Sequence, residues 1–136
     1  RFFTLDEAGR LLPALRPLLA RIVAQRQELR QHAQLLERFR ARASREGGVT
    51  PGGDLARARE AVGRLQASIQ ETAERVQALG CQIKDLDVGL VDFPALRAGE
   101  PVLLCWRLGE DRIRFWHGLG EGFAGRKPLD EDPLVG

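Results

Sequence analysis

The chain has no methionine, tyrosine or asparagine, and only two cysteines, Cys81 and Cys105. Two cysteines are too few for a disulfide framework, so both are expected to be reduced thiols. No apolar run approaches the ~18 residues of a membrane-spanning helix, and no signal peptide opens the sequence. These absences predict a cytoplasmic protein that neither crosses a membrane nor depends on disulfide bonds.

Aromatic residues make up only 6% of the chain, and the net charge is only +2. Basic residues nevertheless concentrate in residues 1–80, where fourteen arginines stand against nine acidic residues. These arginines are interleaved with glutamine and glutamate, without the aromatic side chains that stack on nucleic acid bases. The pattern is typical of solvated helix faces and disfavours nucleic acid as a partner.

Two segments carry the same apolar repeat, in which spacings of three and four residues alternate. Such a repeat places apolar side chains along one face of an α-helix. With Ala43 opposite Ala58 in an antiparallel arrangement, the two repeats match at every level, and the turn is centred between Thr50 and Pro51. The sequence therefore predicts a long antiparallel helical hairpin. The matched pairs are Phe39/Val62, Leu36/Leu65, His32/Ile69, Leu29/Thr72, Gln25/Val76 and Ile22/Leu79.

Local signals mark the ends of the two helices. Residues 4–7 form a capping box, in which the threonine hydroxyl and the glutamate carboxylate bind free backbone amides. Pro13 lies inside the helical repeat and predicts a kink near Gly9 to Pro13. Asp54 is expected to cap the second helix, and Gly80 is expected to end it.

Beyond the second helix the apolar period changes to two residues, as in β-strands. Residues 81–84 and 90–93 predict two short strands, whereas residues 101–108 and 112–117 predict a hairpin with a tight turn at Glu110-Asp111. This turn pairs Leu108/Ile113, Trp106/Phe115 and Leu104/His117. The buried face of the sheet needs a cover, which we expect from Leu11, Leu12, Leu15, Leu18 and Leu19.

Together these elements predict an α+β fold. A kinked helix and helical hairpin occupy residues 1–80, and a three- to four-stranded antiparallel sheet with a glycine-rich tail occupies residues 81–136, all in one structural unit. A projecting arm of two helices buries too little apolar surface to be stable alone, so we expect a homodimer in which two hairpins form a four-helix bundle. Gln25 and His32, polar residues at core positions of the arm, would then set the register of the partners.

Ordered blocks along the chain resemble a known family. They are Phe3-Thr4, Leu11-Leu12-Pro13, Lys84-Asp85, Gly89-Leu90-Val91-Asp92-Phe93-Pro94, Leu104-Cys105-Trp106-Arg107-Leu108-Gly109-Glu110, Trp116-His117 and Gly122-Phe123-Ala124-Gly125-Arg126. In this order they are similar to the prokaryotic family known as domain of unknown function 2203. The resemblance implies a small cytoplasmic bacterial protein. It implies no activity, so no functional residue is carried over from it.

His117 is the strongest single candidate for chemistry. It ends a predicted strand, with Glu121 four residues later and Asp92 in a neighbouring strand. A histidine with two carboxylates can hold a divalent metal such as zinc, manganese or iron, so these residues predict a metal site or a metal-dependent enzyme. The spacing is not diagnostic, and a histidine at the core edge bonded to one of these acids is the simpler interpretation.

A second candidate site lies on the other face of the predicted hairpin. There Arg107 falls opposite Arg114, with Trp116 beside them, and Arg126 follows in the glycine-rich tail. Like charges placed opposite each other destabilise a sheet unless something neutralises them. The counter-charge is either an acidic residue of a neighbouring strand or a bound carboxylate or phosphate.

Nucleophilic catalysis finds little support. Cys105 and His117 are the one conceivable pair of nucleophile and base, and the predicted pairing puts them on opposite faces of the sheet. The sequence therefore favours a non-enzymatic binding protein that holds a small anion or a protein partner at the sheet. The alternatives are a metal-binding protein or enzyme centred on His117, and a scaffold that acts through its helical arm.

Overall fold

The computed structural model describes residues 1–45 and 52–129. Two helices followed by an antiparallel sheet confirm the α+β fold, although the sheet has five strands rather than three or four. In these described ranges, no helix is long and apolar enough to cross a membrane. The predicted hairpin turn at Thr50 and Pro51 lies outside them. The elements are α1 (Leu5–Arg45), α2 (Gly52–Ala78), β1 (Gln82–Asp85), β2 (Leu90–Arg97), β3 (Glu100–Arg107), β4 (Phe115–His117), the 3-10 helix η1 (Phe123–Gly125) and β5 (Lys127–Pro128).

The capping box at the start of α1 is formed as predicted. The Glu7 backbone amide donates to the Thr4 hydroxyl oxygen at 3.0 Å, and the Thr4 amide donates to a Glu7 carboxylate oxygen at 2.9 Å. The bond from the Thr4 amide favours the charged carboxylate and lowers the pKa of Glu7. This contact therefore stabilises the fold above the pKa of the unfolded chain, and its contribution is lost as the pH falls through the lower, folded-state pKa.

Replacing Thr4 by alanine is expected to lower the free energy of unfolding by about 0.5–2 kcal/mol, because the Glu7 amide loses its acceptor. Urea denaturation at neutral pH measures the change. Thr4→Ser keeps the hydroxyl and is the matched control, with little change expected. In Glu7→Gln, the loss of stability on acidification should be smaller than in the wild type. Equal stability of the alanine and serine variants would contradict the role given to the hydroxyl.

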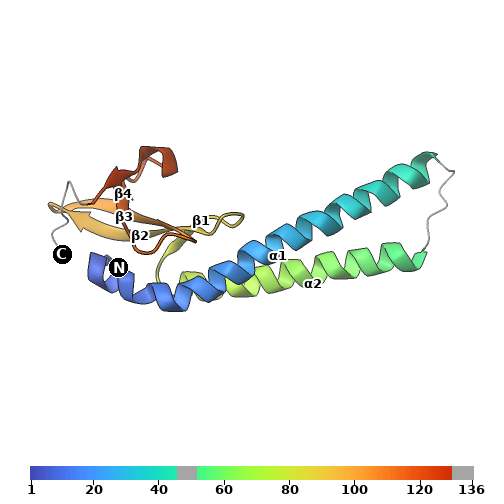
Figure 1. The fold of residues 1–136 in the computed structure, drawn as a ribbon, viewed down its shortest axis with the longest axis horizontal. Helices are drawn as coiled ribbons and strands as arrows, with labels where there is room; N and C mark the ends of the chain where they lie inside the picture. Colours follow the sequence, from blue (N-terminus) through green and yellow to red (C-terminus); the bar gives the residue numbers. More distant parts are fainter. Residues whose placement is uncertain (46–51, 130–136) are drawn as a thin grey trace.

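α1 is one uninterrupted helix of 41 residues, with Pro13 and Pro17 inside it. Figure 1 shows that its axis changes direction within its first, blue part. A proline inside a helix removes an amide donor and crowds the carbonyl one turn earlier, which bends the axis without ending the helix. The bend agrees with the kink predicted from the sequence.

α2 begins at Gly52, two residues before the predicted cap Asp54, and ends at Ala78. Gly80 follows with φ at +104°, a left-handed conformation that glycine adopts without strain. A Cβ atom at this position would lie 2.7 Å from Cζ of Phe3. Gly80 therefore ends the helix, as predicted, and also makes room for the N-terminal segment.

The two helices pack antiparallel, but the predicted alignment of their side chains is wrong. Gln25 donates to Ser68 Oγ at 2.8 Å, although the matched repeats place it opposite Val76, about two helical turns away. Phe39 lines a hollow with Asp54, which lies about two turns from Val62, the predicted partner of Phe39. A heptad repeat matches almost equally well after a shift along the helix, so the apolar pattern alone does not select the alignment.

The five strands lie side by side in chain order, β1-β2-β3-β4-β5, and all neighbours are antiparallel. β2 and β3 are joined by the turn Ala98-Gly99, whose φ angles of 51° and 80° are both positive. A two-residue turn of this kind matches the twist of the strands that it joins. It extends β2 to Arg97, beyond the predicted end at residue 93, and sets Asp92 opposite Cys105.

β4 pairs with β3 one residue out of the predicted register. The prediction set His117 opposite Leu104 through a tight turn, but the connection over residues 108–114 is longer and includes Gly109 at a φ of +105°. Because successive side chains of a strand point to opposite faces, a shift by one residue exchanges the two faces of β4. Trp116 therefore joins the core, and His117 does not. The observed pairs are Leu103/His117, Leu104/Trp116 and Cys105/Phe115.

The core lies between one face of the sheet and the first half of α1. Of the five leucines predicted to cover the sheet, Leu12, Leu15 and Leu19 are buried there, and Leu11 and Leu18 are partly buried against the same core. Beyond this core the two helices continue away from the sheet (Figure 1); we call residues 25–45 of α1 and 52–68 of α2 the arm. The sheet contributes Val91, Phe93, Val102, Leu104, Trp106 and Trp116 to the core.

Candidate functional site

Three polar side chains meet on the outer face of the sheet, opposite the core. They are Asp92 on β2, Cys105 on β3 and His117 on β4, three adjacent strands. Asp92 lies opposite Cys105, while His117 lies opposite Leu103, which is two residues from Cys105 and so shares its face. A carboxylate oxygen, the thiol sulfur and a ring nitrogen all lie within 4.8 Å of one another. We call these three residues the Asp–Cys–His cluster.

The cluster is closed to solvent, with Asp92, Cys105 and His117 exposed by 1%, 0% and 2%. His117 Nε2 lies 3.1 Å from both carboxylate oxygens of Asp92, and Nδ1 lies 2.8 Å from the Gly118 carbonyl oxygen. Both ring nitrogens thus face acceptor oxygens. With Nδ1 donating to the Gly118 carbonyl oxygen, a proton shared between Nε2 and Asp92 satisfies both contacts.

The Cys105 thiol is chemically quiet in this environment. Burial, and to a smaller extent the charge of Asp92, raises the pKa of the Cys105 thiol to about 12. A protonated, buried thiol is a poor nucleophile, although a metal ion bound to the sulfur would remove its proton. The prediction that Cys105 and His117 lie on opposite faces is wrong, as a result of the register of β4.

A glycine-rich segment, residues 118–126, lies over the outer face, and we call it the strap. In Figure 1 it is the dark red segment on the side of the sheet away from α1. Arg126 donates to the Cys105 carbonyl oxygen at 3.2 Å and to a Glu110 carboxylate oxygen at 2.6 Å. Its guanidinium also lies 4.1 Å from the centre of the Phe115 ring. These contacts hold the end of the strap against the strand that carries Cys105.

Glu121, predicted as a metal ligand, belongs to the strap instead. Its Oε1 accepts hydrogen bonds from Lys127 Nζ and from the Gly118 amide, both at 2.8 Å. The bond from Lys127 is the main reason that the pKa of Glu121 is lowered. The structure therefore brings together the predicted His117 and Asp92 but uses Glu121 to hold the strap.

Cys105 is the member of the cluster that sequence reasoning missed. The sequence did contain a usable signal, the dipeptide Ala98-Gly99. A two-residue turn at this dipeptide fixes the register of β2 and β3 and sets Asp92 opposite Cys105. The position of His117 depended on the irregular connection before β4, for which no such signal exists.

The four residues predicted to bind an anion do not form one site. Arg114 makes a two-point ion pair with Asp111, with both distances 3.0 Å, and Arg107 is not opposite it. Trp116 is in the core, on the other face of the sheet. The guanidinium groups of Arg107 and Arg126 lie 6.0 and 4.5 Å from the centre of the Phe123 ring in the strap. The counter-charge for Arg114 is thus an acidic residue, as one of the two predicted alternatives had it. It comes from the adjacent loop, at Asp111, rather than from a neighbouring strand.

The sequence model of one protein family matches residues 1–129, and its description is Uncharacterized conserved protein (DUF2203). The chain belongs to this family. The resemblance predicted from the ordered sequence blocks is thereby confirmed. No curated protein and no solved structure shows a significant match.

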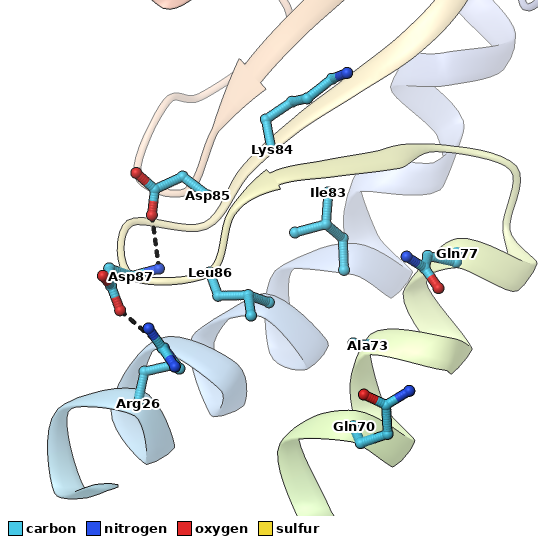
Figure 2. A pocket seen from close by; sticks show the side chains of 9 residues that line it. All are labelled: Arg26, Gln70, Ala73, Gln77, Ile83, Lys84, Asp85, Leu86 and Asp87. Atoms are coloured by element: carbon cyan, nitrogen blue, oxygen red, sulfur yellow. Dashed lines mark hydrogen bonds and ion pairs between the residues drawn. The ribbon is translucent and has the colours of Figure 1, made fainter. Parts of the chain in front are cut away.

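The structure also has an open cleft of about 450 Å³ between β1 and the two helices. Figure 2 shows Ile83 of β1 and Leu86 of the following turn pointing toward the helices. Gln70, Ala73 and Gln77 line the cleft from α2. The lining is apolar at its centre and offers amide groups at its rim, and none of the predicted site residues is part of it.

The charged rim of this cleft joins the sheet to α1. Asp87 accepts from Arg26 Nε at 2.9 Å and from Arg30 at 2.7 Å, and the first of these contacts is drawn in Figure 2. The hydrogen bond from Arg26 is the main cause of the lowered pKa of Asp87. The charges of Asp87 and these arginines are therefore already paired with each other. The Asp–Cys–His cluster is the stronger candidate for chemistry.

Proposed function

We propose that this protein binds a divalent metal ion of the zinc class through Asp92, Cys105 and His117. The spacing of the donor atoms carries the proposal. His117 Nε2 lies 3.1 Å from both Asp92 oxygens, and two ligands bound at ~2.0 Å in tetrahedral geometry are ~3.3 Å apart. The Cys105 sulfur, within 4.8 Å of the other donors, needs to move by about 1 Å to complete a three-ligand site.

The donor set also suits this class of metal. One imidazole nitrogen, one thiolate sulfur and one carboxylate oxygen form a borderline-soft set, which zinc and its neighbours in the first transition series accept. The harder ions magnesium and calcium prefer sites built from oxygen alone.

The burial of the cluster supports metal binding over a simple hydrogen-bonded network. An ionisable pair of a carboxyl group and an imidazole is costly to bury, and the outer face of a sheet would normally leave it in water. The chain instead covers this face with a strap that is held by the Arg126–Glu110 and Lys127–Glu121 ion pairs. A metal ion bound to all three side chains would offset the burial cost, because it satisfies both the carboxylate and the thiolate.

Three protein ligands leave one tetrahedral position for water or another small ligand. The cluster is at most 2% exposed beneath the strap, so a substrate has no route to this position in the described conformation. We therefore propose metal binding rather than catalytic turnover.

Metal analysis of untagged protein tests the proposal. We expect about one zinc-class ion per chain in the wild type, and less than about a tenth of that in Cys105→Ser and His117→Ala. Cys81→Ser is the matched control, because Cys81 is also a buried thiol but bonds the Val76 carbonyl oxygen outside the cluster. After loading with cobalt, a thiolate charge-transfer absorption should be present in Cys81→Ser and absent in Cys105→Ser.

Two results would overturn the proposal. One is a wild type that binds neither zinc nor cobalt when each is added to the metal-free protein. The other is an equal metal content in the two cysteine variants. Either result would leave the cluster as a hydrogen-bonded network.

We also propose that the protein works in the bacterial cytoplasm. Both cysteines are buried and unpaired, and burial raises the pKa of the Cys81 thiol to about 11. A reducing compartment keeps such thiols free for a metal ion, which supports this location. Cell fractionation with an antibody to the native protein would test it, and recovery outside the cytoplasm would contradict it.

A further inference from the structure

The outer half of the arm, residues 29–45 of α1 and 52–65 of α2, buries few side chains. Within these two ranges only Leu36, Ala58 and Ala61 are buried. Five larger apolar residues of the seam are only half-buried: Leu29, Phe39, Leu55, Val62 and Leu65. Two helices whose facing apolar side chains are only half-buried leave much of this apolar surface in water.

One face of the arm carries a groove. A hollow of about 370 Å³ is lined by Leu35 and Arg57, among others, and a second hollow of about 270 Å³ is lined by Glu28 and Ala61. His32 lines both hollows, so they meet at this residue. The groove thus runs along the arm on both sides of His32.

The groove faces away from the sheet. Arg30 binds Asp87 in the turn between β1 and β2, so the side of α1 at Arg30 faces the sheet. His32 follows two residues later, about 200° around the helix. A partner that docks in the groove therefore does not collide with the sheet of the same chain.

We propose that the groove receives the arm of a second copy of this chain, so that two hairpins form a four-helix bundle. The twofold axis passes close to His32 and sets the two arms antiparallel, with the sheets at opposite ends. Such an axis brings Glu28 of one copy to the level of residue 36 of the other. Arg57 lines the groove at that level, in the hollow that also contains Leu35. Arg57 is paired there with Asp54 of its own chain, and Asp54 lines the same hollow. Glu28 of each copy therefore meets this Arg57–Asp54 pair of the other, so the apolar residues of the groove rather than net charge carry the docking.

The size of the arm is sufficient for a stable dimer. An axis at His32 sets residues 19–45 of α1 alongside the same range of the other copy, a span of ~40 Å. Two helices side by side are ~20 Å wide, so the dimer would bury up to ~1,600 Å² in total; specific interfaces bury ~1,200–2,000 Å². Small side chains on α2, Ala58 and Ala61, allow the second pair of helices to approach closely.

Sedimentation equilibrium of the full chain at micromolar concentration provides the first test. We expect about twice the 15.1 kDa of one chain. Leu35→Arg places a charge in the groove on each copy and should raise the dissociation constant at least about a hundredfold, while circular dichroism shows the helices retained. Leu96→Arg is the matched control, because Leu96 on β2 is 38% exposed and Leu35 is 37% exposed. This variant should remain a dimer.

Cross-linking locates the axis without relying on a destabilising change. His32→Cys should give disulfide-linked dimers on mild oxidation, because the two copies of position 32 lie beside the axis. Gln34→Cys lies two residues further, about 200° around the helix, and should give none. The native Cys81 and Cys105 are buried and do not compete.

A wild type that sediments as one chain at micromolar concentration would overturn the proposal, as would cross-linking at position 34 but not at position 32. Both assays run equally well with a chelator present. Their outcome is therefore separate from that of the metal proposal.

Discussion

Replacing His117 by leucine is expected to lower the free energy of unfolding of the metal-free protein by about 3–5 kcal/mol. The change leaves the Asp92 carboxylate buried, with the Cys105 thiol beside it but without its ionic partner. A buried charge without a partner carries the full cost of its removal from water. Urea denaturation in the presence of a chelator measures this loss. Gln34→Leu is the control, because Gln34 is exposed on the side of α1 away from the groove, and it should change stability little.

The double variant Asp92→Leu/His117→Leu sharpens this test. Replacing a whole buried ion pair by apolar side chains is often close to neutral, because neither charge has to be buried. We therefore expect the double variant to recover most of the stability that His117→Leu loses. The two single losses would add up in the double variant if Asp92 and His117 acted independently. That additivity would contradict the ion pair.

Replacing Trp106 by alanine is expected to cost about 3–5 kcal/mol. The side chain is fully buried where the sheet meets α1, its indole nitrogen donates to the Glu110 carbonyl oxygen at 3.2 Å, and the Arg16 guanidinium lies 5.8 Å from its ring. Its removal opens a cavity that the surrounding strands fill only in part. The free energy of unfolding from urea titration reports the loss.

Phe2→Ala is the control for the tryptophan variant. Phe2 is also aromatic but half exposed, so its removal is expected to change stability by less than about 0.5 kcal/mol. Similar losses in the two variants would mean that Trp106 does not occupy the centre of the core.

The features that the sequence predicted correctly depend on near neighbours in the chain. The capping box at residues 4–7 needs only groups three residues apart. The leucines that cover the sheet follow the helical period, so the buried set Leu12, Leu15 and Leu19 could be chosen without knowledge of the sheet. The alternation over residues 101–108 likewise identified Val102, Leu104 and Trp106 as core residues.

The errors concern alignments between elements that are distant in the chain. The apolar repeats of α1 and α2 match at more than one offset, and Gln25 meets Ser68 rather than Val76. The predicted pairing of His117 with Leu104 was wrong for a related reason. A tight turn at residues 110–111 was a plausible connection, but the chain uses a longer loop, and the strand register shifted by one residue.

Periodicity within the chain was enough to identify both helices and four of the five strands of the described residues, because backbone geometry repeats over a few residues. The two-residue strand β5 is too short to show a period. The meeting of Asp92, Cys105 and His117 could not be read in this way. It depends on how β4 docks against β3, and a one-residue change in that docking moves His117 from one face of the sheet to the other. The long-range packing that selects this register therefore also selects the chemistry of the site.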